Sequence, residues 1–332
     1  MTSAWWSVLL MVVAPPEESP NPLSPKSSDA SPAAAVRVVA TVDGEPITVR
    51  DVARELVIAG AARRRWNGRQ DDPWFLAMRD QLVSRRLVEK WLRESQQAAS
   101  AAEIDLAREQ LVARQAQRGV KWEDYLEQQQ LDESRLHRAL AWQIAWGRFL
   151  DKQLQPANLE KYFHKHRRDF DGTELRVAHI VWPLPPQLSA TLVREVHAMA
   201  QDVVERIRRG EITFEAAARQ YSSGPSREQG GDIGWIARRE PMPESFSAAA
   251  FALEPQQVSA PVETAVGIHI IRCLDVRPGK KELSEVLGEV ETRVTRYLFE
   301  WAADQVRERT RIEYPEVAAS QDSELAPSPG SS

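Results

Sequence analysis

The sequence predicts an α+β protein in which a small antiparallel sheet covered by helices is joined to a separate helical domain. Two observations predict it. Apolar residues recur every three or four positions over much of residues 49–169 and again over 282–309, which is typical of amphipathic helices. Between them, residues 173–278 follow the order β-α-α-(loop strand)-α-β-β. We therefore expect two folded parts with different architectures.

The composition excludes several classes of protein. The 332 residues are 42% hydrophobic and 27% charged, enough apolar material for folded domains. Lys and Arg number 43 against 48 Asp and Glu, so nucleic-acid binding is not expected, because it needs an excess of basic residues. Cys273 is the only cysteine, which excludes an internal disulfide and a cysteine-based zinc site. No run reaches the ~18–20 apolar residues of a membrane-spanning helix.

The chain ends predict export and disorder. Residues 4–14 form an apolar run with the length of a signal-peptide core, although no Lys or Arg precedes it. It favours export to the cell envelope or periplasm. The alternatives are a frayed N-terminus or a missed upstream start, in which case the protein is expected to be cytoplasmic. The expected organisation is a signal segment with a disordered linker (1–35), a helical domain (36–172), an α+β domain (173–278), a C-terminal helix (279–313) and a disordered tail (314–332).

The helical part is expected to open with a hairpin. Residues 36–49 are rich in β-branched side chains and contain the turn pair Asp43-Gly44. Thr48 is expected to cap a helix that ends near Gly68. Further helices are expected from Pro73, over 101–117, around Trp122, from Asp132 to Gln155 and from Asn158 to about Asp169.

The C-terminal segment 282–309 is amphipathic and has no later element to pack against. We expect it to fold back onto the N-terminal helices. The alternatives are a free helix or one that forms a homodimer with a second copy.

In the α+β part, each element has a start or stop signal. We expect a strand over 175–182, helices capped by Ser189 and Thr213, a short helix over 244–253, and strands over 257–261 and 266–276 joined by a turn at 263–265.

Five segments of this part resemble the parvulin family of peptidyl-prolyl isomerases. In chain order they are RVAHIV (176–181), FEAAARQYS (214–222), GGDIGW (230–235), FSAAAFAL (246–253), and VSAPV (258–262) leading into GIHII (267–271). The region before them is similar to the N-terminal part of SurA- and PrsA-type envelope chaperones, in VATVDGEPIT (39–48) and LVSRRLV (82–88). The resemblance implies a parvulin-like domain and a SurA/PrsA-like helical chaperone domain completed by the C-terminal helix.

The resemblance also implies a function. It predicts an isomerase and folding chaperone that acts on X-Pro bonds of unfolded or exported polypeptides. Rotation about a peptide bond needs neither a metal nor a cofactor, because the barrier falls when the twisted amide is bound better than the planar one. No metal or cofactor is therefore expected, and the charge balance argues against nucleic acid as a partner.

The site residues follow from the same resemblance. Met242 and Phe246 match the proline pocket, four positions apart on one helical face. His179 and His269 match paired histidines on neighbouring strands beneath the amide, and Thr264 matches a hydroxyl that bonds one of them. Ile233 completes the substrate-binding set, together with the loop residue Gly224.

Two positions depart from the family pattern. Gly224 stands where active relatives place Cys or Asp facing the amide, and Val266 where some have Ser. Ser222 or Ser223 would fill the gap if the loop shifted by one residue. Loss of a polar group beside the amide weakens stabilisation of the twisted state more than binding of the proline ring. The alternative function is therefore a non-catalytic parvulin-fold chaperone, and replacing Gly224 with Asp is expected to raise activity.

Overall fold

The computed structural model describes residues 37–58, 70–129, 131–185, 189–239 and 241–315. The signal-like run at 4–14, the linker up to residue 35, the predicted helix end near Gly68 and residues 316–332 of the predicted tail lie outside these ranges.

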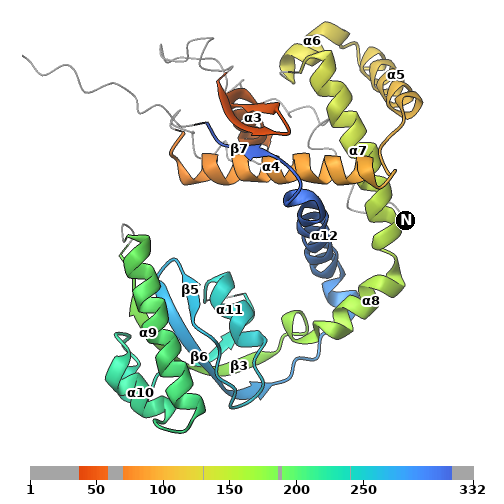
Figure 1. Cartoon of the computed structure of the whole chain (residues 1–332). Coiled ribbons are helices and arrows are strands. Elements are labelled where there is room, and N and C mark those ends of the chain that lie inside the picture. The colour runs from red at the N-terminus through yellow and green to blue at the C-terminus, as the bar shows by residue number, and fades with distance from the viewer. Residues whose placement is uncertain (1–36, 59–69, 130, 186–188, 240, 316–332) are drawn as a thin grey trace, which may run out of the picture. The chain divides into compact units, whose positions relative to one another are not determined.

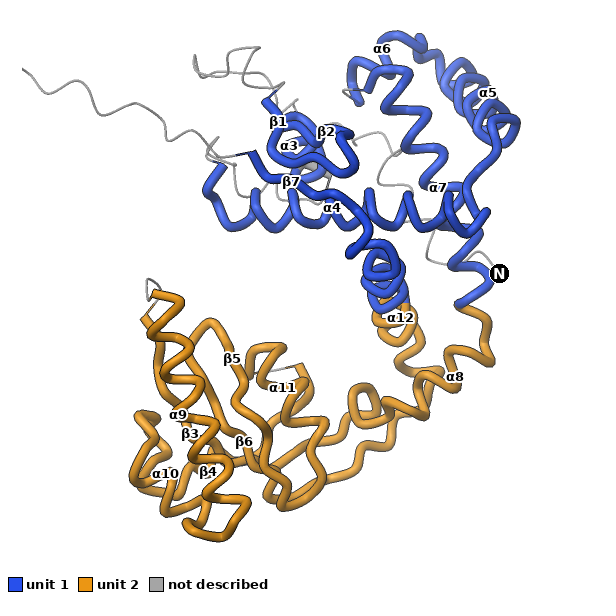
Figure 2. The backbone as a smooth tube through the Cα atoms, in the orientation of Figure 1, with its two compact units in different colours: residues 1–153, 295–332 blue, residues 154–294 orange. Residues whose placement is uncertain are grey.

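The chain divides into two compact units (Figure 2). Unit 1 comprises Met1–Gln153 and Thr295–Ser332, and unit 2 comprises Leu154–Val294. The second unit is thus inserted into the sequence of the first.

Unit 1 begins with a sheet of strand order β2-β1-β7. Strands β1 (Val38–Val42) and β2 (Glu45–Thr48) form the predicted hairpin, with positive φ at both Asp43 and Gly44, as a tight hairpin turn requires. The hairpin prediction is confirmed. Strand β7 (Ile312–Glu313) pairs antiparallel with β1 and was not predicted, because two residues carry no periodic signal and their partners lie far away in the sequence.

Two helices of unit 1 begin at the predicted positions Thr48 and Asp132, and a third begins at a capping box that was not predicted. Asp132 Oδ1 accepts the Arg135 N–H at 2.8 Å, and Ser100 and Glu103 form a capping box. Thr48 Oγ1 accepts the Asp51 N–H at 3.3 Å. The helices are α3 (Val49–Ile58), α4 (Pro73–Glu94), α5 (Ala101–Gln117), α6 (Trp122–Gln128) and α7 (Glu133–Gln153).

The long helix α12 (Leu283–Arg307) ends inside unit 1. The ring of Trp301 meets Trp91 of α4 edge to face at 5.2 Å, and Phe299 meets Trp142 and Trp146 of α7 edge to face. The prediction that the C-terminal helix folds back onto the N-terminal helices is confirmed by these contacts.

Unit 2 contains a four-stranded antiparallel sheet of order β4-β3-β6-β5 (Figure 1). Its elements are α8 (Pro156–Lys165), the 3-10 turn η3 (Arg167–Asp169), β3 (Glu174–Pro183), α9 (Ala190–Arg208), α10 (Phe214–Tyr221), η4 (Arg227–Gln229), β4 (Asp232–Ala237), α11 (Glu244–Phe251), β5 (Val262–Thr264) and β6 (Gly267–Arg277).

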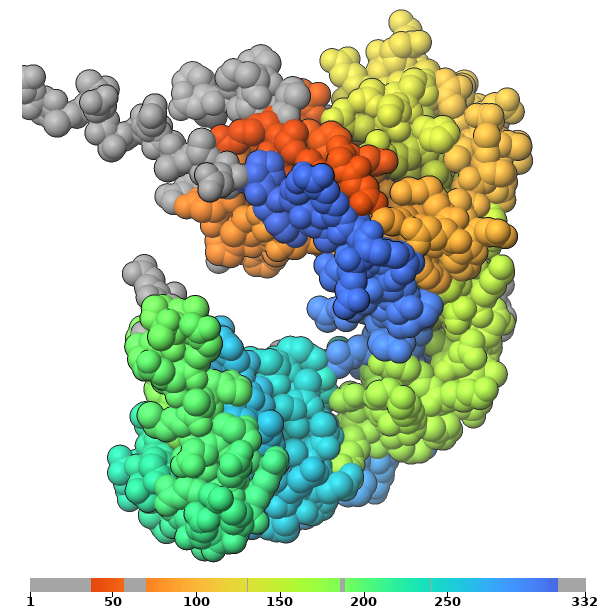
Figure 3. Space-filling view, in the orientation of Figure 1, coloured from red at the N-terminus to blue at the C-terminus, as the bar shows by residue number. Residues whose placement is uncertain are grey.

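Both faces of this sheet are covered. Ala178, Ile180 and Ile270 point toward α9 and α10, whose side chains form the green surface in Figure 3. Val177 and Ile271 belong to the opposite face and pack with α11. Because side chains alternate along a strand, the odd-numbered residues of β3 and β6 in this region share the α11 face.

One predicted strand is wrong. In the run 257–261, expected to pair with β6, only Val258 forms an isolated bridge, and the strand lies at Val262–Thr264. The run is still bonded to β6, because the Ser259 N–H donates to the Ile271 carbonyl at 2.8 Å and the Cys273 N–H to the Gln257 carbonyl at 3.1 Å. Pro261 has no N–H and interrupts this ladder, so the regular strand begins after it. The turn consequently falls at Ala265 and Val266, later than the 263–265 expected.

Within the described ranges, no helix combines the length and apolar character needed to cross a bilayer.

Candidate active site

Two buried histidines meet on the α11 face of the sheet. His179 lies on β3 and His269 on β6, where Val181 is the direct partner of His269. The histidines are therefore diagonal neighbours with side chains on the same face. Their Nδ1 atoms are 3.4 Å apart, and their rings stack with centroids 5.5 Å apart.

Thr264 extends this pair into a chain of three side chains. Its Oγ1 lies 3.0 Å from His269 Nε2, accepts the Val266 N–H at 3.1 Å and lies 3.2 Å from the Gly267 carbonyl oxygen. The hydroxyl has one proton to donate. If it goes to the carbonyl, His269 Nε2 carries a proton and His179 donates from Nδ1. If it goes to His269, the order reverses and His179 carries its proton on Nε2.

The surroundings keep the two rings neutral. Burial lowers the pKa of His179, and burial together with the neighbouring His179 lowers the pKa of His269 to about 4. A neutral imidazole both donates and accepts, whereas two protonated rings would place N–H groups against each other. The outer nitrogen of His179 is therefore a donor or an acceptor according to the bond that Thr264 makes.

Phe246 supports both histidine rings. It is fully buried and meets His179 and His269 edge to face, with centroids 5.8 and 5.3 Å away. Met242 and Ile233 are partly buried and pack against the same cluster. The prediction that Met242 and Phe246 share one helical face is wrong: Pro243 is the N-cap of α11, so Met242 precedes the helix.

Gly224 lies beside the outer nitrogen of His179. A Cβ atom at this glycine would be 3.4 Å from His179 Nε2 and 2.8 Å from Val181 Cγ1. Val181 therefore occupies part of the space that a side chain here would need. Val266, the other departing position, is 57% exposed in the β5–β6 turn.

Ser222, expected as a substitute for the missing polar group, instead binds backbone N–H groups. Its hydroxyl is buried and accepts the N–H groups of Val181 and Gly224, both at 3.2 Å. Ser223 is exposed, and its N–H donates to the Val181 carbonyl at 2.9 Å. These bonds fix the loop to β3 and place Gly224 opposite His179.

Gly231 was missed by the sequence analysis as a site residue. Its carbonyl accepts the His179 N–H at 2.9 Å, and its φ is +87°. A Cβ atom there would lie 2.5 Å from the His179 carbonyl oxygen. The Gly-Gly pair at 230–231 is the signal that could have identified this close approach.

Arg238 anchors the helix that carries Phe246. Its guanidinium donates to Asp169 Oδ1 at 2.6 Å and to both carboxylate oxygens of Glu244 at 2.8 Å. The bond from Arg238 lowers the pKa of Glu244 to about 2. Nothing in the sequence indicated this network, because its three members come from separate segments.

The comparisons with known proteins agree with this arrangement. Residues 179–275 match the family model of the rotamase domain, described as the PPIC-type PPIASE domain. Unit 2 thus contains a parvulin-type domain. The match to SurA extends over 252 residues and so reaches beyond this domain into the helical region.

Three similar proteins illustrate the likeness. The foldase protein PrsA of Bacillus subtilis is 45% identical over 95 residues, covering 27% of this chain and 32% of PrsA. The chaperone SurA of Alkalilimnicola ehrlichii is 24% identical over 252 residues, covering 73% of this chain and 57% of SurA. A crystal structure of a PpiC-type peptidyl-prolyl cis-trans isomerase domain is 30% identical, with a TM-score of 0.30, covering 34% of this chain and 98% of that domain. The chain thus matches less than two thirds of the length of either full-length relative.

Proposed function

We propose that the chain is a peptidyl-prolyl isomerase and folding chaperone that acts on X-Pro bonds of unfolded polypeptides. The observation that carries this proposal is the bonded series of Thr264, His269 and His179 above Phe246, within the segment that matches the rotamase family.

The chemistry suits bond rotation rather than bond cleavage. The ~18–20 kcal/mol barrier comes from amide resonance, and it falls when the site binds the twisted amide better than the planar one. Met242 and Ile233 offer partly exposed apolar surface for a proline ring, and Phe246 supports the histidines from below. His179 Nε2 supplies a hydrogen-bonding group beside the rotating bond.

The helical unit is proposed to hold the unfolded client. The names of the relatives, a foldase and a chaperone, support this role. The export expected from residues 4–14 and a homodimer through the C-terminal helix stay proposals. Cell fractionation with N-terminal sequencing tests the first, and light scattering of the purified chain tests the second.

Gly224 favours a second candidate function. With no side chain beside His179 Nε2, the domain would bind proline-containing segments without turning them over. Peptide binding without acceleration of isomerisation would establish this non-catalytic chaperone.

The deciding experiment is exchange NMR of a short X-Pro peptide with the full chain, Thr264→Ser and Thr264→Val. We expect the wild type and Thr264→Ser to accelerate exchange. Thr264→Val should reduce the rate about tenfold, the equivalent of one hydrogen bond of ~1.4 kcal/mol. Thr264 is a positioning residue, so the ¹⁵N shifts of the histidine rings should report a changed tautomer in Thr264→Val. Equal rates in the two variants, with unchanged shifts, would contradict the role given to the three bonded side chains.

A further inference from the structure

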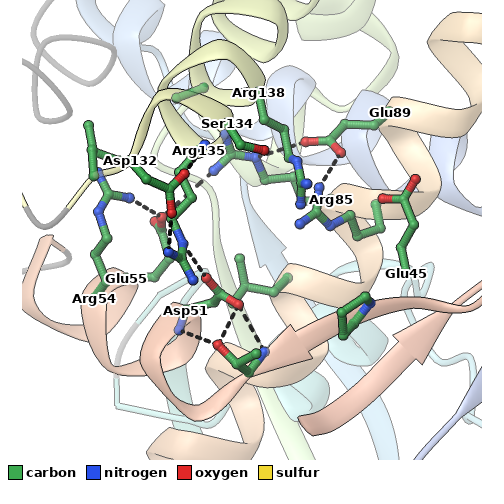
Figure 4. A pocket seen from close by; sticks show the side chains of 16 residues that line it. Glu45, Asp51, Arg54, Glu55, Arg85, Glu89, Asp132, Ser134, Arg135 and Arg138 are labelled. Atoms are coloured by element: carbon green, nitrogen blue, oxygen red, sulfur yellow. Dashed lines mark hydrogen bonds and ion pairs between the residues drawn. The ribbon is translucent and has the colours of Figure 1, made fainter. Parts of the chain in front are cut away.

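Unit 1 contains a pocket of ≈ 320 Å³ between β2, α3, α4 and α7 (Figure 4). Sixteen residues line it, of which five are arginines and five are acids. It belongs to the helical unit and shares no residue with the histidine site. A volume of this size accommodates a small ligand or part of a peptide.

Most of the acids in this pocket already have partners. Asp51 accepts hydrogen bonds from Thr48 and Arg135, and Asp132 pairs with Arg135 at 2.5 Å. Glu55 pairs with Arg54 at 3.1 Å. The oxygens of these three carboxylates therefore already bind side chains of the protein.

Two arginines are not satisfied in this way. Arg138 is partly buried and has neither a hydrogen bond nor an ion pair among the residues that the structure describes. Arg85 lies 3.6 Å from Glu89 and 3.9 Å from Glu55, distances too long for hydrogen bonds, and its guanidinium stacks over the Trp142 ring. In Figure 4 the side chain of Arg138 extends from α7 toward the side of the pocket that Arg85 and Glu89 occupy.

Arg138, which has no partner among the described residues, and Arg85, whose ion pairs are long, favour an anionic ligand. Burial lowers the pKa of Arg85, and the attraction of Glu89 and Glu55 only opposes this effect. A buried donor without an acceptor is costly, and a carboxylate offers two oxygens that match the guanidinium fork.

The other lining residues favour a carboxylate attached to a polypeptide over a free phosphate. Pro46, Leu82, Leu131 and Ala139 add apolar surface, which a peptide covers and an inorganic ion does not.

We propose that this pocket binds one carboxylate of an unfolded polypeptide, an Asp or Glu side chain or the C-terminus, through Arg85 and Arg138. The proposal rests on the proposed function in one respect, that the helical unit holds unfolded clients. It adds a chemical preference that the parvulin-type domain does not explain.

The test is fluorescence anisotropy with the full chain and labelled peptides that differ only in the carboxylate. One pair carries a free or an amidated C-terminus, and a second carries an internal Glu or Gln. We expect at least one of the acidic peptides to bind about tenfold more tightly than its neutral counterpart, which corresponds to ~1.4 kcal/mol.

Arg138→Gln should abolish that difference. Because Arg138 makes no hydrogen bond or ion pair to lose within the described residues, the variant should remain folded. Arg114→Gln is the matched control, since Arg114 is an exposed arginine of the same unit outside the pocket. If both variants lose the preference for the acidic peptide equally, net charge alone explains the preference and the proposal is overturned. Equal affinity of the acidic and neutral peptides for the wild type would also overturn it.

Further measurements separate this proposal from the proposed function. Arg138→Gln should leave X-Pro exchange unchanged, because the variant lies outside the isomerase domain. Binding of both peptides with equal affinity would refute the pocket alone, whereas no peptide binding at all would refute the chaperone role as well. Inorganic phosphate distinguishes a second alternative. If low concentrations of phosphate displace the acidic peptide, and the acidic and neutral peptides bind with the same affinity, the pocket binds a free anion and the proposal is overturned.

Discussion

His179 and His269 face each other through their Nδ1 atoms at 3.4 Å, although 90 positions separate them in the sequence. Only one proton fits between two such atoms. The contact therefore requires that at least one ring be unprotonated at Nδ1, which excludes two charged rings, and burial lowers the pKa of both histidines. This makes the stability of unit 2 sensitive to pH.

The stability of unit 2 should fall as the pH falls from about 6.5 to about 4. The pKa of His269 is about 4 in the fold and ~6.5 in an unfolded chain, so the unfolded chain binds more protons in this window. The contribution is fully present above pH 6.5, and its loss is at most about 3 kcal/mol. Denaturant unfolding at a series of pH values measures it.

A variant and a second pH window serve as controls. His269→Asn should reduce the slope between pH 6.5 and 4 but not remove it, because burial also lowers the pKa of His179. An unchanged slope would contradict the assignment. The pKa of Glu244 is lowered to about 2 by Arg238, so this carboxylate contributes stability above pH 4.5 that is lost as the pH falls toward 2. The two effects therefore separate along the pH axis.

Gly224→Asp alone should not raise isomerase activity, contrary to the expectation from the sequence. The new Cβ would lie 2.8 Å from Val181 Cγ1, and such overpacking costs about 1–3 kcal/mol. Gly224→Asp combined with Val181→Ala removes the clash, places a carboxylate near His179 Nε2 and should increase the exchange rate above that of Val181→Ala. Exchange NMR measures the rates. A double variant no faster than Val181→Ala would show that a polar group here is not what limits the rate.

Gly231→Ala should destabilise unit 2 far more than Gly234→Ala. Both glycines have positive φ, +87° and +80°. A Cβ at Gly231 would lie 2.5 Å from the His179 carbonyl oxygen, whereas one at Gly234 meets nothing within 4 Å. We expect a loss of about 1 kcal/mol for Gly234→Ala and more than about 2 kcal/mol for Gly231→Ala. Similar denaturation midpoints for the two variants would refute the close approach.

Trp301→Ala should weaken unit 1, because its ring packs against Trp91. We expect a loss of about 1–3 kcal/mol of unfolding free energy. Trp74→Ala removes an indole that is 62% exposed in the same unit and should cost much less. Thermal unfolding compares the two variants. If Trp301→Ala unfolds at the wild-type temperature while it changes the molecular mass in light scattering, the helix docks on a second copy instead.

Local signals in the sequence predicted most elements and much of the site. Asp132, Ser189 and Thr213 were predicted to cap helices that the structure contains, because a capping side chain bonds a backbone N–H only three residues away. The histidines came from a family pattern, and the alternation along β3 and β6 accounts for their common face.

Long-range arrangements could not be predicted in the same way. Strand β7 pairs across almost the whole chain, and the arginine pocket assembles from four separate elements. Arg238 has its partners at Asp169 and Glu244, a relation that no periodicity encodes. The position of β5 was missed because the run 257–261 has strand-like composition, while regular pairing starts only after Pro261.

The pairing of β1 with β7 has a consequence for biosynthesis. Thr41 and Glu313 lie 272 positions apart, and a ribosome adds roughly 5–20 residues per second, so β1 waits roughly 15–50 s for its second neighbour. During that interval one edge of the first strand is open to other chains. All residues of the parvulin-type domain have been synthesised before β7 can complete the sheet of unit 1. A nascent chain therefore contains the whole of the inserted unit while unit 1 is still incomplete.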